Sequence, residues 1–143
     1  MSFLFVRALR DGEDMDVKFG YTGIRVKDLE ASVKFYTSVL GMMEVARFTQ
    51  QSTKGTVVIL MREPGGHQLE LNYYPPGNRF DTRYEAGEGL DHLGFEVKDL
   101  DGVLAEARKA GYPAILEMQD PEHRWAYIQD PNGIWIEFFV PPS

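Results

Sequence analysis

The amino-acid sequence predicts an α+β fold of two consecutive βαβββ modules, whose strands form a curled mixed sheet around a cavity. The first observation behind this prediction is a repeat, because Val26-Lys-Asp-Leu29 recurs as Val97-Lys-Asp-Leu100, 71 positions later. The second is that both halves show the same order of strand and helix patterns. Further pairs follow in the same order at nearly the same spacing: Tyr21 and His92, Ile24 and Phe95, Gly41 and Gly111, Leu69–Leu71 and Ile136–Phe138.

The first half, residues 19–74, has the pattern of one strand, one helix and three strands. Alternating apolar residues over 19–26 predict the first strand. Asp28 is a typical helix N-cap, apolar residues at helical spacing over 29–40 predict the helix, and Gly41 ends it. Three further runs are strand candidates: 43–50, 56–62 and 67–73.

The second half, residues 90–143, repeats this order. Apolar alternation over 90–97 predicts a strand, Asp99 is the expected N-cap of a second helix, and Gly111 follows the end of that helix. The segment Asp130-Pro-Asn-Gly133 is a strong turn signal and predicts a hairpin. The remaining strand candidates of this half are 113–118, 125–129 and 134–140.

Two segments lie outside the repeat. Residues 1–18 precede the first strand and are predicted to be an N-terminal extension, either an arm or an extra strand. Residues 75–89 begin with Pro75-Pro-Gly-Asn78, which is typical of a loop. They are predicted to connect the two modules.

Composition limits the class of function. The chain has 143 residues, the length of one domain, and a net charge of −7. No basic run exceeds two residues, which argues against nucleic-acid and anionic membrane partners. The absence of cysteine excludes disulfides, thiolate nucleophiles and cysteine-ligated zinc. With no signal-peptide core and no apolar run near the ~20 residues of a membrane span, we expect a cytoplasmic protein.

Four repeat-equivalent positions form the candidate site. Tyr21 and His92 lie on the first strands of the two halves, and Glu70 and Glu137 lie on the last strands. Each Glu stands between two bulky apolar residues, so its side chain points to the opposite sheet face from its neighbours. If the first and last strands curl into one cavity, all four side chains meet there.

The residue types suit a divalent cation. Carboxylate oxygens and one imidazole are ligands for Ni²⁺, Co²⁺, Zn²⁺ or Mn²⁺. Three ligands, Glu70, His92 and Glu137, would leave positions open for a substrate with adjacent oxygens. Such a metal can stabilise an enediolate formed by proton loss next to a carbonyl, with a glutamate as the base. The competing interpretation is that the glutamates are solvent-facing strand residues and His92 is a hydrogen-bonded structural residue.

Tyr21 is a weaker ligand than its counterpart His92. A phenol has a pKa of ~10 and binds metal poorly unless the metal lowers that value. Tyr21 is therefore a candidate pocket residue, hydrogen-bond donor or proton relay in catalysis. The alternative is a half-buried strand aromatic.

Other side chains are candidate substrate contacts. Arg25 is four residues after Tyr21, hence on the same strand face, and can pair with a substrate carboxylate. Its alternative is a surface ion pair. Trp135 is two residues before Glu137 and shares its face, as a pocket wall or as ordinary core. Arg124 is a further candidate substrate contact, and His123 before it lies near a strand start, where it could rim the pocket.

Four segments carry a resemblance to the glyoxalase I (lactoylglutathione lyase) family of the vicinal oxygen chelate superfamily, which includes bleomycin-resistance proteins and dioxygenases. These segments are Tyr21–Met42, Leu69–Leu71, Asp91–Phe95 and Ala126–Glu137. The resemblance implies the paired βαβββ fold and a divalent metal held by four side chains. Glu70, His92 and Glu137 match three of those positions, whereas Tyr21 stands where the family has His or Gln.

The resemblance also implies roles for single residues. Glu137 matches the catalytic base, Arg25 an arginine that contacts glutathione, and Trp135 an aromatic beside the substrate. Tyr74 stands where eukaryotic members carry Asn and Glu88 where they carry Arg, so these glutathione contacts are absent, and the substrate that Tyr74 would contact is left open. Members of the family commonly form homodimers with sites shared between subunits, so the resemblance implies a homodimer.

Two hypotheses about function follow. The first is an enzyme: a metal-dependent lyase or isomerase acting next to a carbonyl on a small substrate, including thiol adducts. The second is a binding protein of the bleomycin-resistance type, in which a metal-free cavity sequesters a drug or metabolite. Tyr21, Trp125 and Trp135 would suit an aromatic-lined pocket of that kind.

Overall fold

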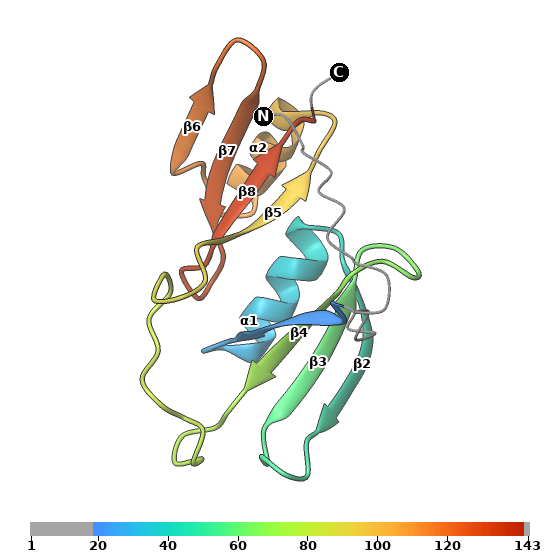
Figure 1. Ribbon diagram of the computed structural model, residues 1–143, viewed down its shortest axis with the longest axis vertical. Helices are drawn as coiled ribbons and strands as arrows, with labels where there is room; N and C mark the ends of the chain where they lie inside the picture. Colours follow the sequence, from blue (N-terminus) through green and yellow to red (C-terminus); the bar gives the residue numbers. More distant parts are fainter. Residues whose placement is uncertain (1–18, 142–143) are drawn as a thin grey trace, which may run out of the picture.

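The computed structural model describes residues 19–141, and two helices and eight strands follow one another in the predicted order (Figure 1). The N-terminal extension predicted over residues 1–18 lies outside the described residues. The elements are β1 (Tyr21–Arg25), α1 (Leu29–Lys34) continued by the π-helical turn η1 (Phe35–Val39), β2 (Met43–Thr49), β3 (Thr56–Met61), β4 (Gln68–Tyr73), β5 (His92–Glu96), α2 (Leu100–Lys109), β6 (Leu116–Gln119), β7 (Arg124–Gln129) and β8 (Trp135–Phe139).

Each module contains one four-stranded mixed sheet. The strand orders are β1-β4-β3-β2 and β5-β8-β7-β6, so the two sheets have the same topology. In both, the first strand pairs in parallel with the last, and the other pairs are antiparallel. A parallel pair needs a long crossover, which the helix and the two intervening strands supply. The predicted tandem βαβββ fold is therefore confirmed.

Local signals in the sequence set the helix ends. The Asp28 side chain accepts a hydrogen bond of 3.0 Å from the Ala31 amide, and Asp99 accepts one of 3.0 Å from Gly102. Both are N-caps, which satisfy amide groups that have no partner within the helix. Gly41 and Gly111 follow the two helices with φ of +68° and +96°, the left-handed conformation that glycine adopts without strain. Neither helix is long and apolar enough to cross a membrane, within the described part of the chain.

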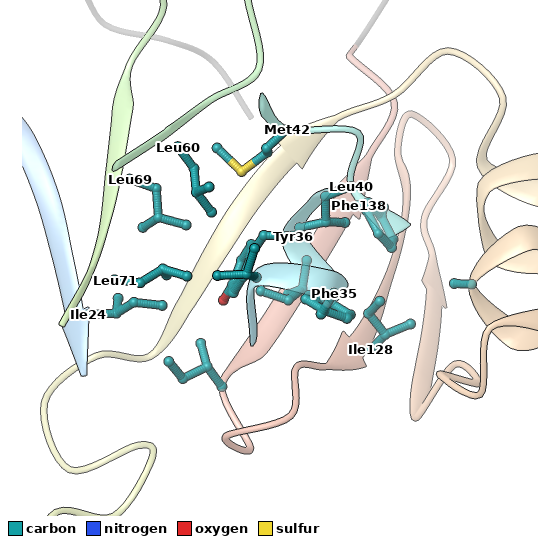
Figure 2. Close-up of a cluster of buried hydrophobic side chains, with 14 of the residues drawn as sticks. Ile24, Phe35, Tyr36, Leu40, Met42, Leu60, Leu69, Leu71, Ile128 and Phe138 are labelled. Carbon is teal, nitrogen blue, oxygen red and sulfur yellow. The ribbon is translucent and has the colours of Figure 1, made fainter. Parts of the chain in front are cut away.

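One hydrophobic core joins the two modules. Phe35 and Tyr36, at the end of the first helix, are fully buried and lie between side chains of both modules (Figure 2). On one side are Ile24 and Leu71, and on the other are Phe138 and Ile128. Phe35 also contacts Tyr112 of the second module, with the ring centroids 4.6 Å apart. The helix of the first module therefore fixes how the second module docks.

A buried polar cluster strengthens this junction. The Tyr36 hydroxyl donates a 2.8 Å hydrogen bond to Asp130, which lies in the turn between β7 and β8. Asn132, in the same turn, accepts a 2.7 Å hydrogen bond from the Lys27 amide, and its side-chain amide donates to Ser32 at 3.1 Å. Burial, and then the Asp130 carboxylate, raise the pKa of Tyr36 far above its ordinary value, so the hydroxyl stays protonated. The predicted turn thus also connects the modules.

Candidate metal and substrate site

Strand alternation gives each sheet an open face that points away from the hydrophobic core. Leu69 and Leu71 are buried against the helices, whereas Glu70 between them is half-buried and faces the other way. Glu137 has the same position between Ile136 and Phe138. The predicted orientation of both glutamates is therefore what the structure shows.

A glycine lies beside each of these glutamates. Gly23 pairs with Glu70, and Gly94 pairs with Glu137, in the two parallel strand pairs. Neither glycine has positive φ, and a Cβ at either position would come no closer than 3.4 Å to its neighbours. Packing and backbone conformation therefore do not require glycine, and a glycine within a strand is typical of a place where a ligand approaches closely. The repeat contains this signal, since the two glycines are also 71 positions apart.

His92 and Glu137 form a close pair on the open face of the second sheet. The distance from His92 Nε2 to a Glu137 carboxylate oxygen is 2.8 Å. On the other side of the ring, His92 Nδ1 lies 2.7 Å from Asp91 Oδ1. A carboxylate at Nδ1 fixes the ring orientation and directs Nε2 toward the site, as in many ligating histidines.

Tyr127 is a further residue at this pair, and the sequence interpretation did not include it. It lies on β7 directly across from Glu137 on β8. Its ring meets the His92 ring edge-on, with centroids 5.6 Å apart, and lies 5.3 Å from Trp135. Burial, and then the Glu137 carboxylate, raise the pKa of the Tyr127 hydroxyl, which keeps it protonated as a hydrogen-bond donor.

Tyr21 and Glu70 form the corresponding half of the site on the first sheet. Both side chains lie on the open face of this sheet. Tyr21 on β1 pairs with Gln68 on β4, and Gln68 is two residues before Glu70. Over residues 19–141, no group of three or more His, Cys, Asp or Glu side chains is close enough to hold a metal ion. The expectation that all four side chains meet is therefore not met within one chain. The reason is that each module forms its own sheet, so the two half-sites, Tyr21 with Glu70 and His92 with Glu137, lie on separate sheets.

Arg25 and Tyr74 come together, as expected for two residues of one pocket. The Arg25 guanidinium lies 5.4 Å from the Tyr74 ring centroid and donates a 2.8 Å hydrogen bond to the Thr82 hydroxyl. Residues of the inter-module loop close a cavity of about 300 Å³ around them. The cavity is lined by Arg25, Val26, Lys27, Tyr73, Tyr74, Pro76, Asp81, Thr82, Arg83, Tyr84 and Asn132.

Arg124 and Trp135 occupy opposite sides of the second sheet. Trp135 lies on the open face next to Tyr127. Arg124 instead makes two hydrogen bonds of 2.5 and 3.1 Å to Asp101 on helix α2, and it lowers the pKa of that carboxyl. The structure therefore does not bring Arg124 to the open face, because it precedes the open-face residue Trp125 and side chains alternate along a strand.

The fold defines the class of protein: tandem βαβββ modules with acidic and histidine side chains on their open faces. The sequence profile of the Glyoxalase/Bleomycin resistance protein/Dioxygenase superfamily matches residues 18–138. The chain belongs to this superfamily, which confirms the resemblance seen in the sequence.

Similar proteins include glyoxalases. A lactoylglutathione lyase of Haemophilus influenzae is 31% identical over 82% of this chain and 88% of its own. The trypanothione-dependent glyoxalase I of Leishmania major is 32% identical, with a TM-score of 0.71 over 87% of this chain and 86% of its own. TnmS3, an antibiotic binding protein from Streptomyces sp. CB03234, has a TM-score of 0.70 at 21% identity over 91% of this chain and all of its own. At that identity the likeness shows the fold alone.

Proposed function

We propose that the chain is a glyoxalase I-like lyase that isomerises a small substrate next to a carbonyl, with thiol adducts of α-oxoaldehydes as the substrate class. The observation that carries the proposal is the His92–Glu137 pair at 2.8 Å, with Glu70 at the repeat-equivalent position. Lactoylglutathione lyases about 30% identical to this chain support it. In this reaction Glu137 takes the proton from the hydroxyl-bearing carbon next to the carbonyl and returns it to the former carbonyl carbon. The hydroxyl proton moves to the former carbonyl oxygen, so the product is an isomer of the substrate.

The donor set fits a divalent cation. One imidazole nitrogen and two carboxylates suit Ni²⁺, Co²⁺, Zn²⁺ or Mn²⁺, and the Asp91 carboxylate at His92 Nδ1 is the second-layer contact that such a ligand needs. Glu70, His92 and Glu137 would hold the cation, with Tyr21 beside them. The cation would supply positive charge that favours proton loss next to the carbonyl. Arg25 would release the Thr82 hydroxyl and bind a substrate carboxylate in its place. Trp135 would form one wall of the pocket.

The half-sites imply a homodimer in which each site takes Tyr21 and Glu70 from one chain and His92 and Glu137 from the other. Exposed apolar side chains on the open faces support this arrangement, because such patches are typical of protein interfaces. They include Met43, Phe48, Leu116 and Met118, each more than 40% exposed.

Metal content tests the proposal. Purified protein, dialysed and supplied in turn with Ni²⁺, Co²⁺, Zn²⁺ and Mn²⁺, is expected to retain about one ion per chain by elemental mass spectrometry. Glu70→Gln and His92→Ala should each lose it, because each removes one of three protein ligands. Glu117→Gln is the control, since Glu117 lies across from buried Ala126 and outside the open face. Full retention by both ligand variants would contradict the assigned ligands.

Mixing two inactive variants tests whether sites are shared. Glu70→Gln and Glu137→Gln chains are unfolded together, refolded and assayed for lyase activity. If sites lie between chains, half of the dimers are mixed and each contains one intact site, so about a quarter of wild-type activity should return. If each site lies within one chain, every site contains a substitution and the mixture stays as inactive as its parts.

One observation favours the alternative, a metal-free binding protein. The first ligand position holds Tyr21, and the open face of the second sheet carries the aromatic residues Trp125, Tyr127, Trp135 and Phe139. Such a wall would stack on a flat drug or metabolite. No retained metal, together with a rise in melting temperature in a broad ligand screen, would favour this function over the lyase.

A further inference from the structure

The two half-sites differ in what lies across from the glutamate. In the second sheet, Tyr127 on β7 faces Glu137 on β8. In the first sheet, the residue across from Glu70 is Ile59 on β3, which carries no polar group. The repeat therefore makes the two carboxylates equivalent in position, whereas the neighbouring strand gives a hydroxyl to Glu137 alone.

The surroundings of Tyr127 restrict its ring. The ring is fixed between His92, edge-on at 5.6 Å and 86°, and Trp135 at 5.3 Å and 57°. Trp125 lies two residues away on the same open face. The ring is thus held on the strand directly across from Glu137, whose carboxylate contacts His92 at 2.8 Å.

We propose that Tyr127 is a positioning residue, whose hydroxyl donates a hydrogen bond to Glu137 and fixes the orientation of that carboxylate on the open face beside His92. Such a contact engages one carboxylate oxygen and restricts rotation of the whole group, which leaves the other oxygen free to bind the cation. A base that is also a metal ligand benefits from a fixed orientation, and partners of this kind are worth about 10- to 100-fold in metal affinity or activity. Glu70, which faces Ile59, lacks this support. The proposal rests on the proposed function for its catalytic consequence, whereas the Tyr127–Glu137 hydrogen bond can be tested without it.

The contact is tested by NMR of protein labelled with ¹³C at tyrosine Cζ, at one fixed pH. The signal that Tyr127→Phe removes belongs to Tyr127. This signal should shift in Glu137→Gln and stay in place in Glu117→Gln, because Glu117 lies across from buried Ala126. An unchanged Tyr127 signal in Glu137→Gln would overturn the proposal.

The consequence is tested by titration calorimetry of the metal-free protein with Co²⁺ and by steady-state kinetics. Tyr127→Phe keeps the ring and should weaken Co²⁺ binding about tenfold. It should also lower kcat about tenfold and leave KM within about twofold, since only the geometry of the base changes. Tyr112→Phe, which removes a phenol packed on Phe35 outside the site, should change neither. Wild-type affinity and kcat in Tyr127→Phe would overturn the positioning role.

Failure of the proposed function gives a different result. If the wild-type chain binds no Co²⁺ and turns over no substrate, the lyase is excluded. The shift of the Tyr127 NMR signal in Glu137→Gln still tests whether the Tyr127–Glu137 hydrogen bond forms, because this measurement does not depend on catalysis.

Discussion

Replacing Glu137 by Gln is expected to lower kcat/KM for the hemithioacetal substrate about a thousandfold, within the 10²- to 10⁴-fold range of general acid–base catalysis. The amide has the shape of the carboxylate but cannot take a proton from carbon. It also removes the negative charge that lies 2.8 Å from His92 Nε2. The measurement is the initial rate with hemithioacetals that methylglyoxal forms with glutathione and with other thiols.

Glu70→Gln is the matched comparison, because Glu70 has the equivalent place in the first module. We expect it to weaken metal binding, so that excess Ni²⁺ or Co²⁺ restores part of its activity. Glu137→Gln should gain nothing from added metal, since the missing group is the base. Equal rescue of both variants, or full activity in Glu137→Gln, would contradict the role assigned to Glu137.

Most of the fold could be predicted because the main local signals, the helix caps and the terminal glycines, occur in both halves of the repeat. Two aspartate caps, two terminal glycines and the Asp130–Gly133 turn place the elements to within a few residues. The exceptions come from hydrogen bonding that the pattern does not encode. The helix expected over 29–40 ends in the π-helical turn Phe35–Val39, and the strand expected from Pro113 begins at Leu116, where pairing with β7 starts.

The candidate site could also be predicted in part from the sequence. Alternation was enough to orient Glu70 and Glu137, since their apolar neighbours had to be buried. It could also have excluded Arg124, which is adjacent in sequence to Trp125 and so faces the other side. Tyr127 could have been found from the hairpin, because a turn at 130–133 that pairs Gln129 with Trp135 also pairs Tyr127 with Glu137.

The separation of the half-sites could not be predicted from the strands. It depends on how the two modules dock, and docking is decided by the buried end of the first helix. Phe35 and Tyr36 are apolar and aromatic, which predicts burial but does not identify what covers them. In the structure the second module covers them. Tyr112 packs on Phe35, and Asp130 accepts a hydrogen bond from Tyr36.

The buried Asp130 is therefore expected to dominate stability. Asp130 is 4% exposed, and its carboxylate accepts hydrogen bonds of 2.8 to 2.9 Å from the Asn132 and Ile134 amides, the Asn132 side chain and the Tyr36 hydroxyl. Asp130→Ala would leave these donors unsatisfied and should lower the free energy of unfolding by about 3 kcal/mol or more. Tyr36→Phe removes one of the bonds and should cost about 1 kcal/mol. Urea denaturation at pH 7 would measure both changes.

Because of the Tyr36–Asp130 contact, the free energy of unfolding is expected to depend on pH in the alkaline range. Burial and Asp130 raise the pKa of Tyr36 in the folded chain above the ordinary 10.0 of the unfolded chain. The folded state thus keeps a proton that the unfolded state loses, so this contribution is complete below pH 10 and declines as pH rises further. Above pH 10 the free energy of unfolding should fall about 1.4 kcal/mol per pH unit more steeply in wild type than in Tyr36→Phe. Parallel curves for the two proteins would show that Tyr36 ionises equally in both states and is not held at this junction.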